Sequence, residues 1–154
     1  ALSGALGVSM KPRTATASTA ALRPPVVFDP LTALAIDGYD PVAYFTDHAA
    51  RPGSPQHELR DGRLFWRFLN EGNLAAYRAD PEIYEPLFGG YCPYALSRRL
   101  PTPGNPQIFE IFDGKLIFFF STAHRLGFRK LPKAMLSDAA SHWPDMRLLV
   151  VGRG

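Results

Sequence analysis

The chain has 154 residues, of which 46% are apolar and 12% aromatic, and its formal net charge is +3. This length and composition predict one domain with a sizeable core, plus a tail. The single cysteine, Cys92, excludes an internal disulfide and a multi-cysteine metal site. No apolar run of about 18 residues occurs, so no membrane span is predicted.

Residues 1–27 are predicted to be a tail, because the first 25 residues lack aromatic and acidic side chains. Such a segment cannot bury enough apolar surface to offset its ordering entropy, so we expect it to be disordered. Ala15-Thr16-Ala17 resembles a small-residue cleavage site, which predicts the remnant of an export signal. The expected location is periplasmic or secreted, with the cytoplasm as the alternative. Residues 28–150 then form the single domain.

One pattern occurs twice in this domain. His57–Phe68 is echoed 52 residues later by Phe109–Phe120, with Asp-Gly at 61–62 and again at 113–114. Asp-Gly in a two-residue loop supplies the positive φ values of a type I′ turn, so each copy predicts a β-hairpin. In the first copy, the apolar residues 64, 66 and 68 share one face and the arginines 63 and 67 point the other way, which predicts a half-buried strand. In the second copy, residues 116–120 are all apolar, which predicts a strand covered on both faces.

A helix is predicted after each hairpin. Asn70 and Ser121 can accept a hydrogen bond from the free N–H groups of a helix start. Pro81 and Pro132 discourage continuation, and a last helix is predicted from Pro132 to Pro144. The expected fold class is α+β: one antiparallel sheet from two repeated β-hairpin–helix units, with helices packed on it.

The segment Gly89–Tyr94 is the first candidate site. Pro93 favours an extended conformation at Cys92, and Tyr91 and Tyr94 flank the thiol with hydroxyl-bearing rings. One interpretation is a ligand pocket or a thiol activated by a neighbouring cation. The other, which we prefer, is a tight loop that packs Cys92 into the core.

Residues 38–45 form the second candidate. Asp40 and Pro41 favour the start of a short helix, and an anion could bind at such a start. The preferred interpretation is that Asp40 caps the helix while neighbouring aromatic side chains, among them Tyr39 and Tyr44, pack.

Two alternatives involve histidine. A nucleophilic Cys92 needs a base, and His124 could serve if the fold brings the two together. A metal carrier would combine His124, His142 and Cys92, since no two histidines have helical chelating spacing. No catalytic residue, metal ligand or cofactor is predicted. The basic groups at 98–99 and 125–133 are interpreted as solvated surface, so no nucleic acid is expected.

Three segments resemble the YHS-domain family. Ile36–Phe45 is similar to the IxGYDPVAYF opening of its bacterial exported subgroup. Trp66–Tyr84 resembles the WRF…N…F..DP..Y core, and Phe88–Ser97 resembles the YGGYCAYAVS segment. The resemblance extends over residues 35–144 and implies a small exported accessory or binding protein.

Metal-associated members of that family carry DPVCGM followed by YFCSxxCxxxFxxxP. On this chain the three cysteine positions fall on Ala43, Leu69 and Asn73, none of which is a thiolate. Soft metals and structural zinc need thiolate or imidazole ligands in number. The resemblance therefore implies the fold and not the metal site.

The predicted function is a small exported binding domain without turnover, for an unknown small ligand or protein partner. Its expected pocket lies between residues 39–45 and 88–94. The predicted ligand-binding residues are Tyr39, Asp40, Tyr44, Tyr91, Cys92 and Tyr94. The alternatives are a thiol enzyme or redox sensor using Cys92, and a copper or zinc carrier. A homodimer through apolar surface stays a hypothesis.

Overall fold

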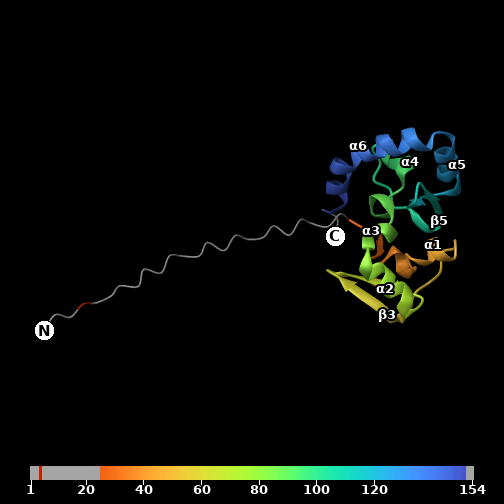
Figure 1. Ribbon diagram of the computed structural model, residues 1–154. Coiled ribbons are helices and arrows are strands. Elements are labelled where there is room, and N and C mark those ends of the chain that lie inside the picture. The colour runs from red at the N-terminus through yellow and green to blue at the C-terminus, as the bar shows by residue number, and fades with distance from the viewer. Residues whose placement is uncertain (1–3, 5–24, 152–154) are drawn as a thin grey trace.

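The computed structural model describes residue 4 and residues 25–151, so the predicted cleavage motif lies outside the described residues. Both helices and strands are present, which confirms the α+β class. In Figure 1 the hairpin that contains β3 (Ser54–Asp61) lies at one end, and α5 (Thr122–Lys130) and α6 (Pro132–Val151) lie at the other. The strand β5 (Asn105–Phe112) lies between these ends.

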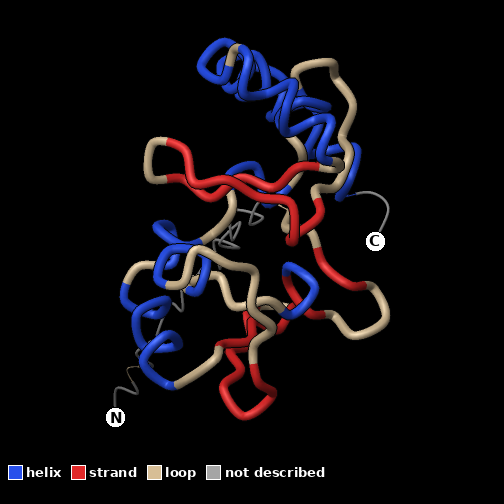
Figure 2. Tube along the Cα trace, turned by 90° about the vertical axis from the view of Figure 1, so that its right-hand side faces the viewer, coloured by secondary structure: helices blue, strands red, loops and turns tan. Residues whose placement is uncertain are grey.

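The described strands form two sheets, where one antiparallel sheet was predicted (Figure 2). The first contains, in order, β1 (Phe28–Asp29), β2 (Leu34–Ala35), β4 (Leu64–Phe68) and β3. The second contains β5 and β6 (Lys115–Phe119). β2 runs parallel to β4, and the other pairs are antiparallel. The single-sheet prediction is wrong: β2 pairs with the β4 edge that faces away from β3, and β5 and β6 pair with each other in a separate sheet.

The two copies of the repeat have the same order of elements, over a longer stretch than predicted. The first copy comprises η1 (Ile36–Gly38), α1 (Ala43–Thr46), β3, β4, α2 (Glu71–Ala79) and α3 (Pro81–Tyr84). The second comprises η2 (Leu87–Gly90), α4 (Pro93–Leu96), β5, β6, α5 and α6. Both hairpins also shift register at the same place, at 54–58 and at 105–109. The duplication therefore includes the 3-10 turn and short helix ahead of each hairpin.

Backbone hydrogen bonds show which residues are equivalent. The Asp40 N–H donates to the Arg51 carbonyl at 2.8 Å, and the Cys92 N–H donates to the Thr102 carbonyl at 2.9 Å. Asp40 and Cys92 are therefore equivalent, 52 positions apart, whereas the paired strands correspond at a separation of 51.

Because the strands correspond at a separation of 51, the two Asp-Gly pairs, which lie 52 positions apart, do not occupy equivalent positions in their turns. In the second hairpin Asp113 and Gly114 have φ values of 47° and 72°, as a type I′ turn requires. In the first hairpin Asp61 belongs to β3, and Gly62, with φ 60°, begins the turn. The prediction of matching Asp-Gly turns is wrong there because strand register places Asp61 opposite Leu64. Glycine at the first turn position is typical of type II′.

The signals that begin and end α2 and α5 behave as predicted. The side chain of Asn70 accepts a hydrogen bond from the Asn73 N–H at 2.8 Å, and that of Ser121 accepts one from the His124 N–H at 3.2 Å. α2 and α5 end just before the predicted prolines, and each proline begins the next helix. The caps satisfy N–H groups that would otherwise lack a partner.

β6 separates two hydrophobic cores. Leu116 and Phe118 belong to the core that contains Trp66, whereas Ile117 and Phe119 belong to the other core. Side chains alternate along a strand, so one apolar run supplies both cores. The predicted strand covered on both faces is confirmed.

α6 continues through Pro144 to Val151, where the sequence predicted an end. Proline removes one hydrogen bond from a helix interior but does not forbid continuation when packing holds both sides. Trp143 packs on Tyr91 at 5.6 Å between ring centroids, and Met146 is buried. None of the helices in the described part of the chain is suited in length and apolarity to cross a membrane.

Candidate functional site

Each copy of the repeat holds a polar pair between its 3-10 turn and its capped helix. In the first copy an Asp40 carboxylate oxygen accepts a hydrogen bond from Asn73 Nδ2 at 2.7 Å. In the second, Cys92 Sγ lies 3.5 Å from His124 Nδ1. Asn73 and His124 are both the third residue of their helices. The contact that the thiol hypothesis required is therefore present.

The Asp40 carboxylate is buried and fully used inside the fold. Beyond Asn73, it accepts hydrogen bonds from the N–H groups of Val42 at 2.8 Å, Ala43 at 3.3 Å and Leu69 at 2.7 Å. Asp40 therefore binds N–H groups at the start of α1, as the preferred interpretation requires, but the helix begins at Ala43 with Val42 at its N-cap position, later than predicted. Ala43, Leu69 and Asn73, at which the YHS resemblance placed cysteines, all donate to this one carboxylate.

Cys92 is buried in the second core with Phe119 and Phe128, and its side chain has no exposed surface. His124 is half-buried, and burial lowers its pKa, with the positive charge of Arg98 adding to the effect. A neutral imidazole is therefore favoured beside the thiol. Strong activation of a thiol needs a neighbouring cation, which a neutral imidazole does not supply.

A stack of side chains connects the buried thiol to the surface. The Tyr94 ring lies on the His124 ring, with centroids 4.4 Å apart and planes at 27°. The Arg98 guanidinium lies 3.8 Å above the Tyr94 ring, and its Nη1 donates to the Tyr94 carbonyl at 3.0 Å and to Ser97 Oγ at 3.2 Å. Gly127 admits the Tyr94 ring, because a Cβ there would overlap it. These contacts fix a cation at the surface.

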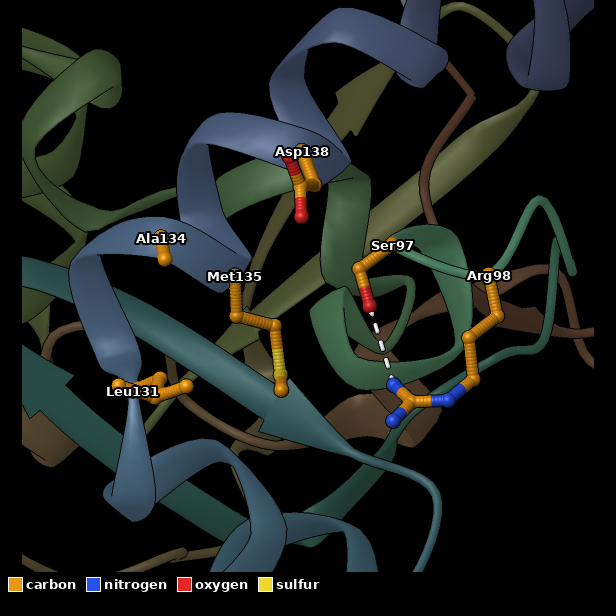
Figure 3. Close-up of a pocket in the computed structure, with 6 residues that line it drawn as sticks. All are labelled: Ser97, Arg98, Leu131, Ala134, Met135 and Asp138. Carbon is orange, nitrogen blue, oxygen red and sulfur yellow. Dashed lines mark hydrogen bonds between the residues drawn. The ribbon is translucent and has the colours of Figure 1, made fainter.

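Beside this cation lies a hollow of about 320 Å³ (Figure 3). Figure 3 shows Ser97 and Arg98 on one side, Leu131 and Met135 on the other, and Asp138 turned toward the space between them. The lining residues are Ser97, Arg98, Leu131, Ala134, Met135 and Asp138. The hollow therefore offers an apolar wall together with one cation and one anion.

The hollow exists where the two copies of the repeat differ. In the first copy the rings of Phe45 and Tyr84 meet edge to face at 5.5 Å and fill the space between α1 and α3. The equivalent residues in the second copy are Ser97 and Met135. A hydroxymethyl group and a flexible thioether replace two aromatic rings, so the second copy leaves this space open.

The remaining predicted residues lie apart from this hollow. Tyr44 is buried and donates its hydroxyl hydrogen to the Pro106 carbonyl at 2.8 Å, and burial raises its pKa. The half-buried Tyr39 hydroxyl bonds to the side-chain amide of Gln107. Tyr91 is almost buried, which raises the pKa of its hydroxyl, and it lines a smaller hollow of about 140 Å³.

The six predicted residues therefore do not form one ligand pocket. Asp40, Tyr44 and Cys92 have no exposed side-chain surface, so a ligand could reach them only after the fold opens. The physical reason is that residues 39–45 and residues 88–94 each pack inside their own copy of the repeat, against that copy's hairpin, and do not face each other across a shared space. Tyr94 does contribute, indirectly, because Arg98 rests on its ring.

The ligand set proposed for a metal carrier is not assembled. His142 Nδ1 lies 2.9 Å from the Leu96 carbonyl oxygen, on the side of α4 where α6 packs. Among residue 4 and residues 25–151, no three His, Cys, Asp or Glu side chains come close enough to hold a metal ion.

Sequence reasoning missed Ser97, Met135 and Asp138. A signal was available: Gly-Tyr-X-Pro-X-Ala occurs at 38–43 and again at 90–95. Aligning these segments would have extended the repeat and exposed the change from an aromatic pair to smaller side chains.

No protein-family model, curated protein or solved structure matches this chain. The function is therefore inferred from the geometry of the site itself.

Proposed function

We propose that this chain is a small binding domain without turnover of its own, and that its ligand occupies the hollow beside Arg98. The observation that carries the proposal is the difference between the repeats. The first copy closes this space with the Phe45–Tyr84 contact, and the second leaves about 320 Å³ open between Ser97 and Met135. This volume is at the lower end of the range that small-molecule sites occupy.

The second repeat also supports binding rather than catalysis. An enzyme nucleophile must be reachable by its substrate, and Cys92 is buried among aromatic side chains. The Cys92–His124 contact instead supports the ring of Tyr94, which in turn carries Arg98. In this proposal the pair positions a surface cation.

The resemblance to exported YHS-domain proteins supports the same class of function, an accessory protein that binds a ligand or a partner. Export to the periplasm or the medium, and the YHS assignment itself, form part of the proposal. The small-residue motif at 15–17 supports export but lies outside the described residues.

The proposal is tested by screening a small-molecule library against the isotope-labelled protein by NMR. We expect hits whose shift changes centre on Ser97, Met135 and their neighbours. The variant Ser97→Phe restores the side chain of the first copy and should abolish those changes. Hits that are unaffected by Ser97→Phe, or an empty screen, would contradict the proposal.

A second candidate function is thiol chemistry at Cys92, which the 3.5 Å contact with His124 favours. Its test is the rate of alkylation by iodoacetamide at pH 6–7. A rate above that of an ordinary exposed thiol, lost in His124→Asn, would establish an activated thiol. A rate at or below the ordinary value would remove this candidate.

A further inference from the structure

The hollow presents two opposite charges on an apolar wall. Arg98 lies on one side and Asp138 on α6 is turned toward the same space, with Leu131, Ala134 and Met135 supplying carbon surface (Figure 3). Such a lining matches a ligand that carries both charges and a hydrocarbon body. A purely anionic ligand would meet the Asp138 carboxylate, and a purely cationic one would meet the guanidinium.

The cation is organised before any ligand arrives. Nη1 of Arg98 is engaged by the Tyr94 carbonyl and by Ser97 Oγ, and the guanidinium plane rests on the Tyr94 ring. Arginine has five N–H donors, so donors remain for a carboxylate. Because the guanidinium is already held, less side-chain entropy is lost when it binds.

We infer that the hollow binds a small aliphatic zwitterion, with a carboxylate on Arg98, an ammonium group on Asp138 and the carbon chain against Leu131 and Met135. This inference rests on the proposed binding function and names the chemical class of its ligand. The charged lining and the missing aromatic pair are both features of the second repeat.

Four probes with six-carbon chains test the class. The zwitterions 6-aminohexanoate and 2-aminohexanoate are isomers that differ in the separation of their charges. Hexanoate and hexylamine each carry one of the two charges. Dissociation constants are measured by NMR titration of the full chain. We expect at least one zwitterion to bind about two- to fivefold tighter than either singly charged probe, the gain expected from one solvent-accessible ion pair.

Charge variants then assign each end of the ligand. Arg98→Gln should remove the advantage of the zwitterion over hexylamine, and Asp138→Asn should remove its advantage over hexanoate. Arg99→Gln is the matched control, because Arg99 is an exposed neighbouring arginine that does not line the hollow. Its titrations should equal those of the parent chain.

Space-filling variants test the place of binding. Ser97→Phe should abolish the shift changes of the bound zwitterion. If that variant unfolds, Ala134→Phe serves instead, since position 134 is exposed and lines the same hollow. Binding that survives a folded space-filling variant overturns the assignment.

The outcomes separate this inference from the proposed function. The ligand class is wrong if hexanoate or hexylamine binds as tightly as both zwitterions. It is also wrong if other library compounds bind the hollow while no zwitterion does. In either case the proposed binding function still stands. If nothing binds the hollow, both fail.

Discussion

The pair Cys92–His124 is best understood through its equivalent, Asp40–Asn73. Both pairs join the second residue after the 3-10 turn to the third residue of the capped helix. In the first copy the link is a charge-assisted hydrogen bond with a carboxylate, and in the second it is a weaker thiol–imidazole contact. The common position indicates a structural connection that each copy makes with different chemistry.

The contact between Tyr94 and Gly127 predicts the effect of a small substitution. Alanine favours a helix by roughly 0.5–1 kcal/mol over glycine. In Gly127→Ala, however, the new Cβ overlaps the Tyr94 ring. Overpacking costs about 1–3 kcal/mol, so after the helix gain is subtracted we expect a net loss of about 0.5–2 kcal/mol in the free energy of unfolding, measured by urea denaturation.

A matched double variant checks this explanation. The first copy has Val42 and Ala76 at the equivalent positions. Tyr94→Val combined with Gly127→Ala should therefore be more stable than the sum of the two single changes predicts. Additive effects would show that the ring and the new methyl group do not compete for space.

The depressed pKa of His124 predicts a dependence of stability on pH. Burial and the nearby Arg98 disfavour the protonated imidazole in the folded chain. The unfolded chain, with a pKa of about 6.5, therefore binds more protons than the folded one as pH falls below 7. The free energy of unfolding should decrease from pH 7.5 to the lower folded-state pKa, and then level off.

The measurement is the urea midpoint between pH 7.5 and 5. His124→Asn, which copies the first repeat, should reduce the slope, because it removes the titrating group. His48→Asn, in an exposed loop position, serves as the control and should keep the parent slope. An unchanged slope in His124→Asn would contradict the assignment.

Among the elements, α6 is the one in which tertiary packing overrides a local stop signal. The sequence favours an end at Pro144, and the helix continues because Trp143 and Met146 pack on the body of the protein. Its N-terminus also forms one side of the hollow, through Ala134, Met135 and Asp138. The helix therefore packs on the first core with one part and lines the hollow with another.

Replacing Pro144 by alanine should stabilise the protein. Proline in a helix interior costs about 3 kcal/mol of stability. Replacing it by alanine also makes the unfolded chain more flexible, which lowers the stability by roughly 0.4–1 kcal/mol. We therefore expect a net gain of about 2 kcal/mol in the free energy of unfolding. Thermal unfolding followed by circular dichroism measures it. Pro132→Ala, at the first position of the same helix, should give no such gain. Equal effects at both positions would argue against a missing hydrogen bond as the cause.

At the scale of the whole molecule, we expect β6 to make the two cores unfold as one cooperative unit. Its alternate residues enter opposite cores, so neither core can be lost without exposing one face of the same strand. Both tryptophans belong to or pack against the first core. Tryptophan fluorescence therefore reports on one core, while circular dichroism reports on all helices and strands.

Phe119→Ala tests this cooperativity. The ring is buried in the second core, and its removal should cost about 3–5 kcal/mol. We expect fluorescence and circular dichroism to shift to the same lower urea midpoint. Phe120→Ala, at a 55% exposed position, should change the stability by less than about 1 kcal/mol. A fluorescence midpoint that stays at the parent value would mean that the cores unfold separately.

For the candidate site, as for the fold, local sequence predicted one part and tertiary packing decided the other. The sequence singled out the segments around Asp40 and Cys92, and both are indeed central to their repeats. The preferred interpretation that Cys92 packs into the core agrees with its burial. The sequence could not show which distant segments cover these residues, because that depends on what packs over each turn. Arg98 and Asp138 lie 40 positions apart, so only the packing of α4 against α6 places them around one space.

By itself the sequence determined the local elements: two hairpins, two capped helices and a strand with both faces apolar. Those features follow from caps, prolines, glycine turns and period-two alternation, which act over a few residues. Only the tertiary structure decided that the hairpins occupy separate sheets, that α6 continues past Pro144, and that the second repeat leaves a charged hollow. Each of these depends on which distant surface is already occupied, a question that local preference does not answer.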